Sequence, residues 1–475
     1  MIKFRFLDFY RRRLKIRRSE QFSGVRTPYL CLVCFIASIA GFLFGYDLNV
    51  MIGGVIFLKS QFQLTPVQLG FAVSCATLGS GVGAVVGGYI SERLGRKKTL
   101  AFTAIIFAVG SIGTAIPTTI IQFDVFRIVG GIGIGLASVV APMYIAEISP
   151  ADLRGRLVTI DQLAILTGAV ISVTICYLLS ATANWRAMFA SEVVPAVLLL
   201  IGLPMIPESP RWLLEKNAVL EAREALGKVY LIEEEIEREV WGITRSIEER
   251  TGTFRDLFHP GLRQATLISV VLAIFVQFTG IAPLDFYLPL IFQQAGFQRA
   301  PDAIFQMVIV NAWMFVCTVI AIWLVDSIGR RPLLLAGLGG MAVGMTLLGM
   351  MFVYKITGEL VIVVTMFCLG CFIASLAPLF WLLASELFPT RLRSKGMGIA
   401  SFTQWTASFI SIQVIPTMLA YAESRFHTIA AIFWLFAVIC LGAIAFSYYM
   451  IPETKNRSLE EIGRSWTSSK VQVPR

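Results

Sequence analysis

The sequence contains little charge for its length. Only 15% of its 475 residues are Asp, Glu, Lys or Arg, whereas 56% are hydrophobic, and the mean hydropathy is +0.75. A soluble globular domain carries much more charge than this on its surface. We therefore expect a membrane protein whose main surroundings are the lipid bilayer.

Residue types that bind metals or act as nucleophiles are scarce or poorly placed. The only two histidines, His259 and His427, are far apart, and the eight cysteines lie in apolar stretches without the spacing of disulfide or zinc sites. The glycine-rich runs 79–83 and 131–135 follow no predicted strand, which favours close helix contacts over nucleotide loops. We predict no metal site, no cofactor and no catalytic residues, so we do not expect an enzyme.

The basic residues behind the net charge of +10 are distributed as expected for a membrane protein. A basic N-terminal segment without a cleavage site precedes the first apolar run, and Lys and Arg collect in alternate loops. Because cytoplasmic loops are enriched in these residues, both termini are predicted to be cytoplasmic in a multi-pass protein of the cell membrane. Topology accounts for the charge, and nucleic acid is not expected as a partner.

Twelve apolar runs are each about 20 residues long, which is enough to span a bilayer. They begin near Tyr29, Val67, Thr99, Ile120, Leu157, Ala187, Ala265, Ala303, Pro332, Leu360, Gly396 and Thr428. The predicted fold is an all-α membrane protein with twelve transmembrane helices in two six-helix halves. The predicted parts are a basic segment (1–28), the first half (29–207), a helical linker (208–262), the second half (263–451) and a cytoplasmic tail (452–475). The linker is either a solvated amphipathic connection, which its pattern favours, or a gating latch.

Three charged motifs occur once in each half and in the same order. Gly95-Arg96 is echoed by Gly329-Arg330, Glu147 and Arg154 by Glu386 and Arg393 with the same spacing, and Pro207-Glu208 by Pro452-Glu453. Such a parallel repeat is typical of transporters in which substrate binds between the halves, near the middle of the membrane.

The repeated charges lie at predicted cytoplasmic helix ends. There, ion pairs between the halves can form when that face is shut and become hydrated when it opens. The candidate gate residues are Glu92, Arg93, Arg96, Glu147, Arg154, Asp326, Arg330, Glu386 and Arg393. The alternative is that these charges only set the topology and cap helix ends.

Arg127 lies alone within an apolar span. A charge at the centre of a bilayer costs roughly 2.5–3.5 kcal/mol on insertion scales, so Arg127 needs a partner. Counted from the cytoplasmic helix ends, Asp47 reaches a similar depth, and we predict that the two side chains pair. The pair is either a proton-coupling site, in which Asp47 titrates as its surroundings change, or a static ion pair.

Amide and aromatic side chains within the spans suit a sugar. A sugar presents apolar C–H faces together with hydroxyl donors and acceptors. The candidates are Gln162, Gln277, Trp381, Gln404 and Trp405. A membrane Trp is also common as an interfacial or packing residue.

The chain resembles the sugar porters of the major facilitator superfamily, and bacterial xylose:proton symporters in particular. The motifs that carry the resemblance are Gly45-Tyr46-Asp47, Gly88 with Glu92-Arg93 and Gly95-Arg96-Lys97, Pro142 to Arg154, Pro207 to Arg211, Asp326 with Gly329-Arg330-Arg331, Glu386 to Arg393, and Pro452 to Lys455. The resemblance implies that Asp47 binds the coupled proton, that the charged set forms a cytoplasmic gate, and that the amides and tryptophans above contact sugar together with Phe44. Glu92 stands where the family usually has Asp.

The seventh span departs from the family pattern. Where the family commonly has two glutamines and later an asparagine, this chain has Val276-Gln277 and then Ala282, followed by Pro283 and Asp285. Asp285 is either a hydroxyl acceptor in the cavity or an exposed acid near the outer end of an unwound helix. The substitutions predict weak glucose binding and a smaller or less hydroxylated ligand.

The expected function is proton-coupled symport of a monosaccharide or related polyol by alternating access. A passive facilitator of the same solutes remains an alternative, as does, with less support, a non-transporting nutrient sensor.

Overall fold

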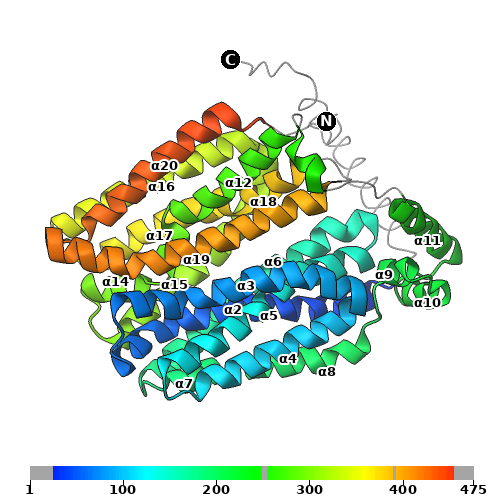
Figure 1. The fold of residues 1–475 in the computed structure, drawn as a ribbon, viewed down its shortest axis with the longest axis horizontal. Coiled ribbons are helices and arrows are strands. Elements are labelled where there is room, and N and C mark those ends of the chain that lie inside the picture. The colour runs from blue at the N-terminus through cyan, green and yellow to red at the C-terminus, as the bar shows by residue number, and fades with distance from the viewer. Residues whose placement is uncertain (1–24, 249–253, 260–261, 389–391, 454–475) are drawn as a thin grey trace, which may run out of the picture.

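The computed structural model describes residues 25–248, 254–259, 262–388 and 392–453. Most of the predicted basic segment and tail lie outside these ranges. Long helices run side by side in two groups, one formed by the first half of the chain and one by the second (Figure 1). The short helices that connect the halves lie beyond one end of the bundle, which we call the linker face; we call the other end the opposite face.

The first half contains α2 (Thr27–Gln61), α3 (Pro66–Leu94), α4 (Arg96–Ala115), α5 (Ile120–Ile148), α6 (Ala151–Ser180), α7 (Trp185–Ala190) and α8 (Val193–Gly202), followed by the short helix η1 (Leu203–Met205). Local sequence explains the start of α3. Thr65 accepts a hydrogen bond from the Gln68 backbone, the Gln68 side chain accepts one from the Thr65 backbone, and Pro66 occupies the first turn.

The linker contains α9 (Pro210–Glu215), α10 (Val219–Val229) and α11 (Glu233–Glu248), with η2 (Phe254–Phe258) after it. Arg223 pairs with Glu233 and Glu237 at 2.5 Å, which joins α10 to α11. The backbone N–H of Arg26 donates to the Val229 carbonyl, so the start of the first span is attached to the linker.

The second half contains α12 (Arg263–Phe278), α13 (Ile281–Asp285), α14 (Leu288–Gln294), α15 (Ala300–Ile328), α16 (Arg330–Val353), α17 (Glu359–Ala374), α18 (Leu376–Glu386), α19 (Arg393–Phe426) and α20 (Ala430–Met450). The seventh span is therefore divided into α12, α13 and α14. The first break is at Gly280, whose φ of +91° is unfavourable for a residue with a side chain. Pro283 lies in the first turn of α13 and has no N–H to donate to the carbonyl of Thr279, four residues earlier, which agrees with the break in the helix there.

Within the described residues, eleven segments are long and apolar enough to cross a membrane. The remaining long helix, α19, has 34 residues and lies alongside α3 and α12, but its Ser, Thr and Gln side chains make it less apolar (Figure 1). With α19 the number of spans is the twelve that were predicted. The all-α prediction is confirmed.

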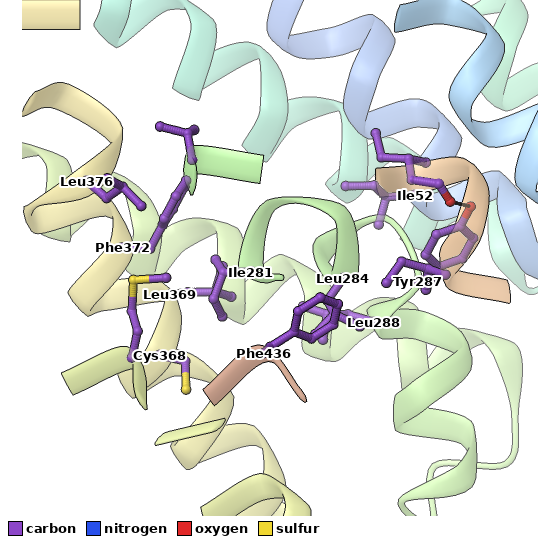
Figure 2. Close-up of a cluster of buried hydrophobic side chains, with 14 of the residues drawn as sticks. Ile52, Ile281, Leu284, Tyr287, Leu288, Cys368, Leu369, Phe372, Leu376 and Phe436 are labelled. Atoms are coloured by element: carbon purple, nitrogen blue, oxygen red, sulfur yellow. Dashed lines mark hydrogen bonds between the residues drawn. The ribbon is translucent and has the colours of Figure 1, made fainter. Parts of the chain in front are cut away.

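Apolar packing joins the halves toward the opposite face. Figure 2 shows Ile281 and Leu284 of α13 among the side chains of the second half, and Ile52 of α2 near Tyr287. These residues belong to one buried cluster. The Tyr287 hydroxyl also donates to the Ile412 carbonyl of α19 at 2.9 Å, which fixes the junction of α13 and α14.

Candidate functional site

Asp47 of α2 and Arg127 of α5 form a buried ion pair, as predicted from their depth. Each residue is 2% exposed, and Arg127 Nη1 donates to Asp47 Oδ1. Close helix contacts position them: a Cβ at Gly131 would lie 2.0 Å from the Ala76 carbonyl of α3, and one at Gly130 would lie 2.8 Å from Asp47 Oδ2. In the part of the chain that the structure describes, Arg127 Nε and Nη2 are buried without a hydrogen-bond partner. The guanidinium therefore has donors left for a second acceptor.

Glu192, between α7 and α8, is a member of this site that the sequence reasoning missed. It is 1% exposed, interacts electrostatically with both Asp47 and Arg127, and its Oε1 has no hydrogen-bond partner. One sequence signal could have identified it, because Glu192 is an acid inside the apolar run that begins near Ala187.

The candidate sugar contacts come from both halves. The rings of Phe44 and Trp405 lie 6.1 Å apart across the boundary between α2 and α19. Gln404 Oε1 and Trp405 Nε1 are buried without a hydrogen-bond partner among the described residues. These two atoms are available to a polar ligand, and the Trp405 ring offers an apolar face.

The other candidates do not contact one another through hydrogen bonds in the described part of the chain. Gln162 is exposed on α6, Gln277 is buried near the end of α12, and Trp381 of α18 is 40% exposed. Asp285, the last residue of α13, is half-buried, and its Oδ1 is enclosed without a partner. Val276 is buried and cannot hydrogen-bond through its side chain.

Toward the opposite face, hydrogen bonds and aromatic contacts join the halves. Ser74 Oγ of α3 donates to Gln413 Oε1 of α19 at 3.0 Å, and Gln413 Nε2 donates to the Val67 carbonyl at 3.0 Å. Two ring pairs also cross the boundary, Phe71 with Phe409 and Tyr177 with Phe305. These contacts join the two halves toward the opposite face.

On the linker face, the repeated charges form the same network in each half. Arg96 makes two hydrogen bonds of 2.8 Å to Glu147, and Arg330 lies 3.2 Å from Glu386. Glu208 accepts from the backbone N–H groups of Arg96 and Lys97 at the start of α4. In the same way, Glu453 accepts from those of Arg330 and Arg331 at the start of α16. Both networks anchor a loop to helix ends.

The predicted pairs between the halves are not among the ion pairs that the structure describes. On the linker face, Arg96 pairs with Glu147 and with Glu215 of α9, and Arg330 pairs with Glu386. Glu92, Arg93 and Arg154 are exposed. Arg393 is half-buried, with Nε and Nη2 lacking hydrogen-bond partners. The side chain of Asp326 lies outside the described residues. Among the described residues, the hydrogen bonds of Gln413 toward the opposite face are the side-chain hydrogen bonds seen between the halves.

The model of the family described as "Sugar (and other) transporter" matches residues 33–466. The chain belongs to this sugar transporter family. It is 35% identical to the arabinose-proton symporter of Bacillus subtilis, over 92% of this chain and 95% of that protein. It is 34% identical to the D-xylose-proton symporter of Escherichia coli, over 93% and 96%. Identity to the E. coli galactose-proton symporter is 35%, over 91% and 93%. Family membership makes the chain a transporter and not an enzyme.

Solved structures share the fold of this sugar transporter. The inward-open xylose transporter XylE of E. coli aligns with a TM-score of 0.79 and 32% identity, over 91% of this chain and 99% of that one. A partially occluded inward-open conformation of XylE gives 0.80 and 32%, over 91% and 100%. The XylE complex with 6-bromo-6-deoxy-D-glucose, described as a major facilitator superfamily protein, gives 0.75 and 33%, over 93% and 99%. The predicted two-half major facilitator fold is confirmed.

Proposed function

We propose that this transporter carries a monosaccharide or related polyol together with a proton, by alternating access. The observation that carries the proposal is the Asp47–Arg127 pair, which is sealed inside the membrane domain of a chain whose relatives are named sugar-proton symporters. A buried carboxylate that can exchange its cation for a proton makes proton binding depend on conformation.

The linker face is cytoplasmic in this proposal, and both termini lie on that side of the cell membrane. The basic loops support this orientation, because cytoplasmic loops are enriched in Lys and Arg. The conformation is then open toward the cytoplasm and shut toward the outside. The TM-scores of 0.79 and 0.80 to inward-open forms of XylE support the same assignment.

The two halves, 29–207 and 263–451, move relative to each other while the linker 208–262 connects them. When the cytoplasmic face shuts, Arg393 brings two unpaired guanidinium nitrogens toward the charges of the first half. Glu147, already bound to Arg96, and its counterpart Glu386 are the acceptors in this gate.

Sugar binds between the halves near Phe44 and Trp405. Gln404, Gln277 and the exposed Gln162 supply hydrogen-bonding amides, and Trp381 supplies an aromatic face. The unpartnered oxygen of Asp285 accepts a hydrogen bond from a sugar hydroxyl. Because Val276 and Ala282 offer no hydrogen bond, a hexose hydroxyl facing them loses its water without replacement. The preferred solute is therefore smaller or less hydroxylated than glucose on that side.

The test is uptake of radiolabelled xylose, arabinose, galactose and glucose into proteoliposomes, with and without a pH gradient that is acid outside. The proposal requires accumulation above equilibrium that disappears when a protonophore collapses the gradient. Uptake that only equilibrates would identify a passive facilitator. Binding without transport of any solute would favour a sensor. Either result would overturn the proposal.

A further inference from the structure

Arg127 has a second acidic neighbour on its own helix. Asp124 lies three residues earlier in α5, and side chains at this spacing project from the same helix face with Cβ atoms about 5–6 Å apart. Arg127 acts electrostatically on Asp124, whose Oδ1 is enclosed without a hydrogen-bond partner. The guanidinium, which is itself 2% exposed, retains two unpartnered nitrogens. A free acceptor and free donors thus lie one helical turn apart.

Asp124 also lies on the outer side of the buried pair. Helix α5 begins at Ile120, at the opposite face, so Asp124 is one turn closer to that face than Arg127. It is half-buried, whereas Asp47 and Arg127 are almost fully enclosed. A proton that enters from the opposite face along α5 reaches Asp124 before Asp47.

The surroundings contain few other groups that could serve in this way. Among the described residues, the titratable groups that act on Arg127 from neighbouring helices are Asp47 of α2, Cys75 of α3 and Glu192 between α7 and α8, and Asp124 itself acts on Cys75. Cys75 is buried, and its thiol hydrogen is directed to the Ala72 carbonyl. In the described part of α4, the charged residues are confined to the linker-face end. The buried Asp161 of α6 lies instead against Gly41 of α2.

We propose that Asp124 is a second proton-binding carboxylate, which passes protons from the opposite-face solution to Asp47 and holds Arg127 while Asp47 is protonated. This inference rests on the proposed function and adds a residue to its proton path. It gives a role to an enclosed acid that lies one helical turn from the buried cation on the same helix.

The proposed transfer from Asp124 to Asp47 conserves charge. The step starts from the pairing of Arg127 with ionised Asp47, and it takes Asp124 as protonated. The O–H bond of Asp124 breaks, an O–H bond forms on Asp47, and Arg127 turns from Asp47 to the newly ionised Asp124. The three side chains carry zero net charge before and after, so no unpaired charge is left in the membrane interior. After Asp47 releases its proton to the linker face and Arg127 returns to it, Asp124 takes another proton from the opposite face.

The experiment compares Asp124→Asn with wild type in right-side-out membrane vesicles. The probe is whichever of xylose, arabinose and galactose wild type accumulates fastest. We expect the initial rate of uptake driven by an outside-acid gradient to fall about tenfold, the change caused by about 1.4 kcal/mol added to the barrier for proton entry. Sugar exchange at equal pH on both sides should stay near wild type, as should the final accumulation ratio, because Asp47 still sets the coupling.

Asp124→Glu should restore the rate, because it restores the carboxylate. Asp302→Asn is the matched control, since it removes an exposed acid in the first turn of α15 at the same face and should have no effect. The inference is wrong if Asp124→Asn keeps the wild-type rate and the wild-type dependence on external pH. It is also wrong if exchange falls in parallel, which would indicate a structural role. Wild type that never accumulates sugar would instead overturn the proposed function itself, and this inference with it.

Discussion

Replacing Asp47 by Asn tests the proton site directly. The amide keeps an oxygen where Asp47 Oδ1 accepts from Arg127 Nη1, but it cannot take up a proton in the physiological range. In a symporter that moves one proton per sugar, a gradient of one pH unit is worth about 1.4 kcal/mol and supports roughly tenfold accumulation. We therefore expect the accumulation ratio to fall from about ten to about one.

The fold should survive this change. Removing one partner of a buried ion pair costs about 3–5 kcal/mol when the other charge is left unpaired. Asp47→Asn should cost less, because Arg127 keeps one acceptor and has Glu192 and Asp124 nearby. Arg127→Ala should carry the full cost, because it leaves Asp47 enclosed at 2% exposure without its cation.

The assay is radiolabelled sugar uptake and counterflow in the same proteoliposomes. We expect Asp47→Asn to exchange sugar but not to concentrate it, whereas Arg127→Ala should be poor in both assays and should unfold at a lower temperature. An Asp47→Asn protein that accumulates sugar as wild type does would refute the assignment. An accumulation ratio that falls only because exchange is lost would assign Asp47 a structural role.

Three further predictions concern the gate, the seventh span and its break. Glu147→Gln or Arg393→Ala should slow net transport, spare sugar binding and raise the labelling of cysteine probes in the cavity from the linker face; unchanged labelling and transport would leave these charges a topological role. The double substitution Val276→Gln with Ala282→Asn should strengthen glucose binding relative to the native sugar. The gain should be about 1–3 kcal/mol per restored hydrogen bond, or five- to 150-fold. The prediction fails if wild type already binds glucose as tightly as any sugar in a competition panel. Gly280→Ala should lower the unfolding temperature for two reasons. Its Cβ would lie 2.2 Å from an aromatic carbon of α20, and residue 280 has a φ of +91°. An unchanged melting curve would show that the junction adapts.

Much of the architecture follows from the sequence because a bilayer imposes simple constraints. Each span must be long and apolar, so the twelve runs predict the helices, and the predicted starts at Ile120 and Val67 lie within one residue of the helix starts at Ile120 and Pro66. A charge inside such a run needs a partner at the same depth. This constraint led from Arg127 to Asp47, because rise per residue converts sequence position into depth.

Depth along a helix specifies neither the rotation of that helix nor the relative position of the halves. Only the tertiary structure determines these two properties. Glu192 lies between α7 and α8 and acts electrostatically on Arg127, and this proximity depends on how the sixth span packs against α5. Asp124 gains its importance from the enclosure of its oxygen rather than from any motif. Likewise, identical repeats do not reveal which face is open. The hydrogen bond of Gln413 joins the two halves, whereas the pairing of Glu147 with Arg96 lies inside one half, and this difference distinguishes the two faces. The sequence cannot make this distinction, because a transporter with two conformations has one sequence for both.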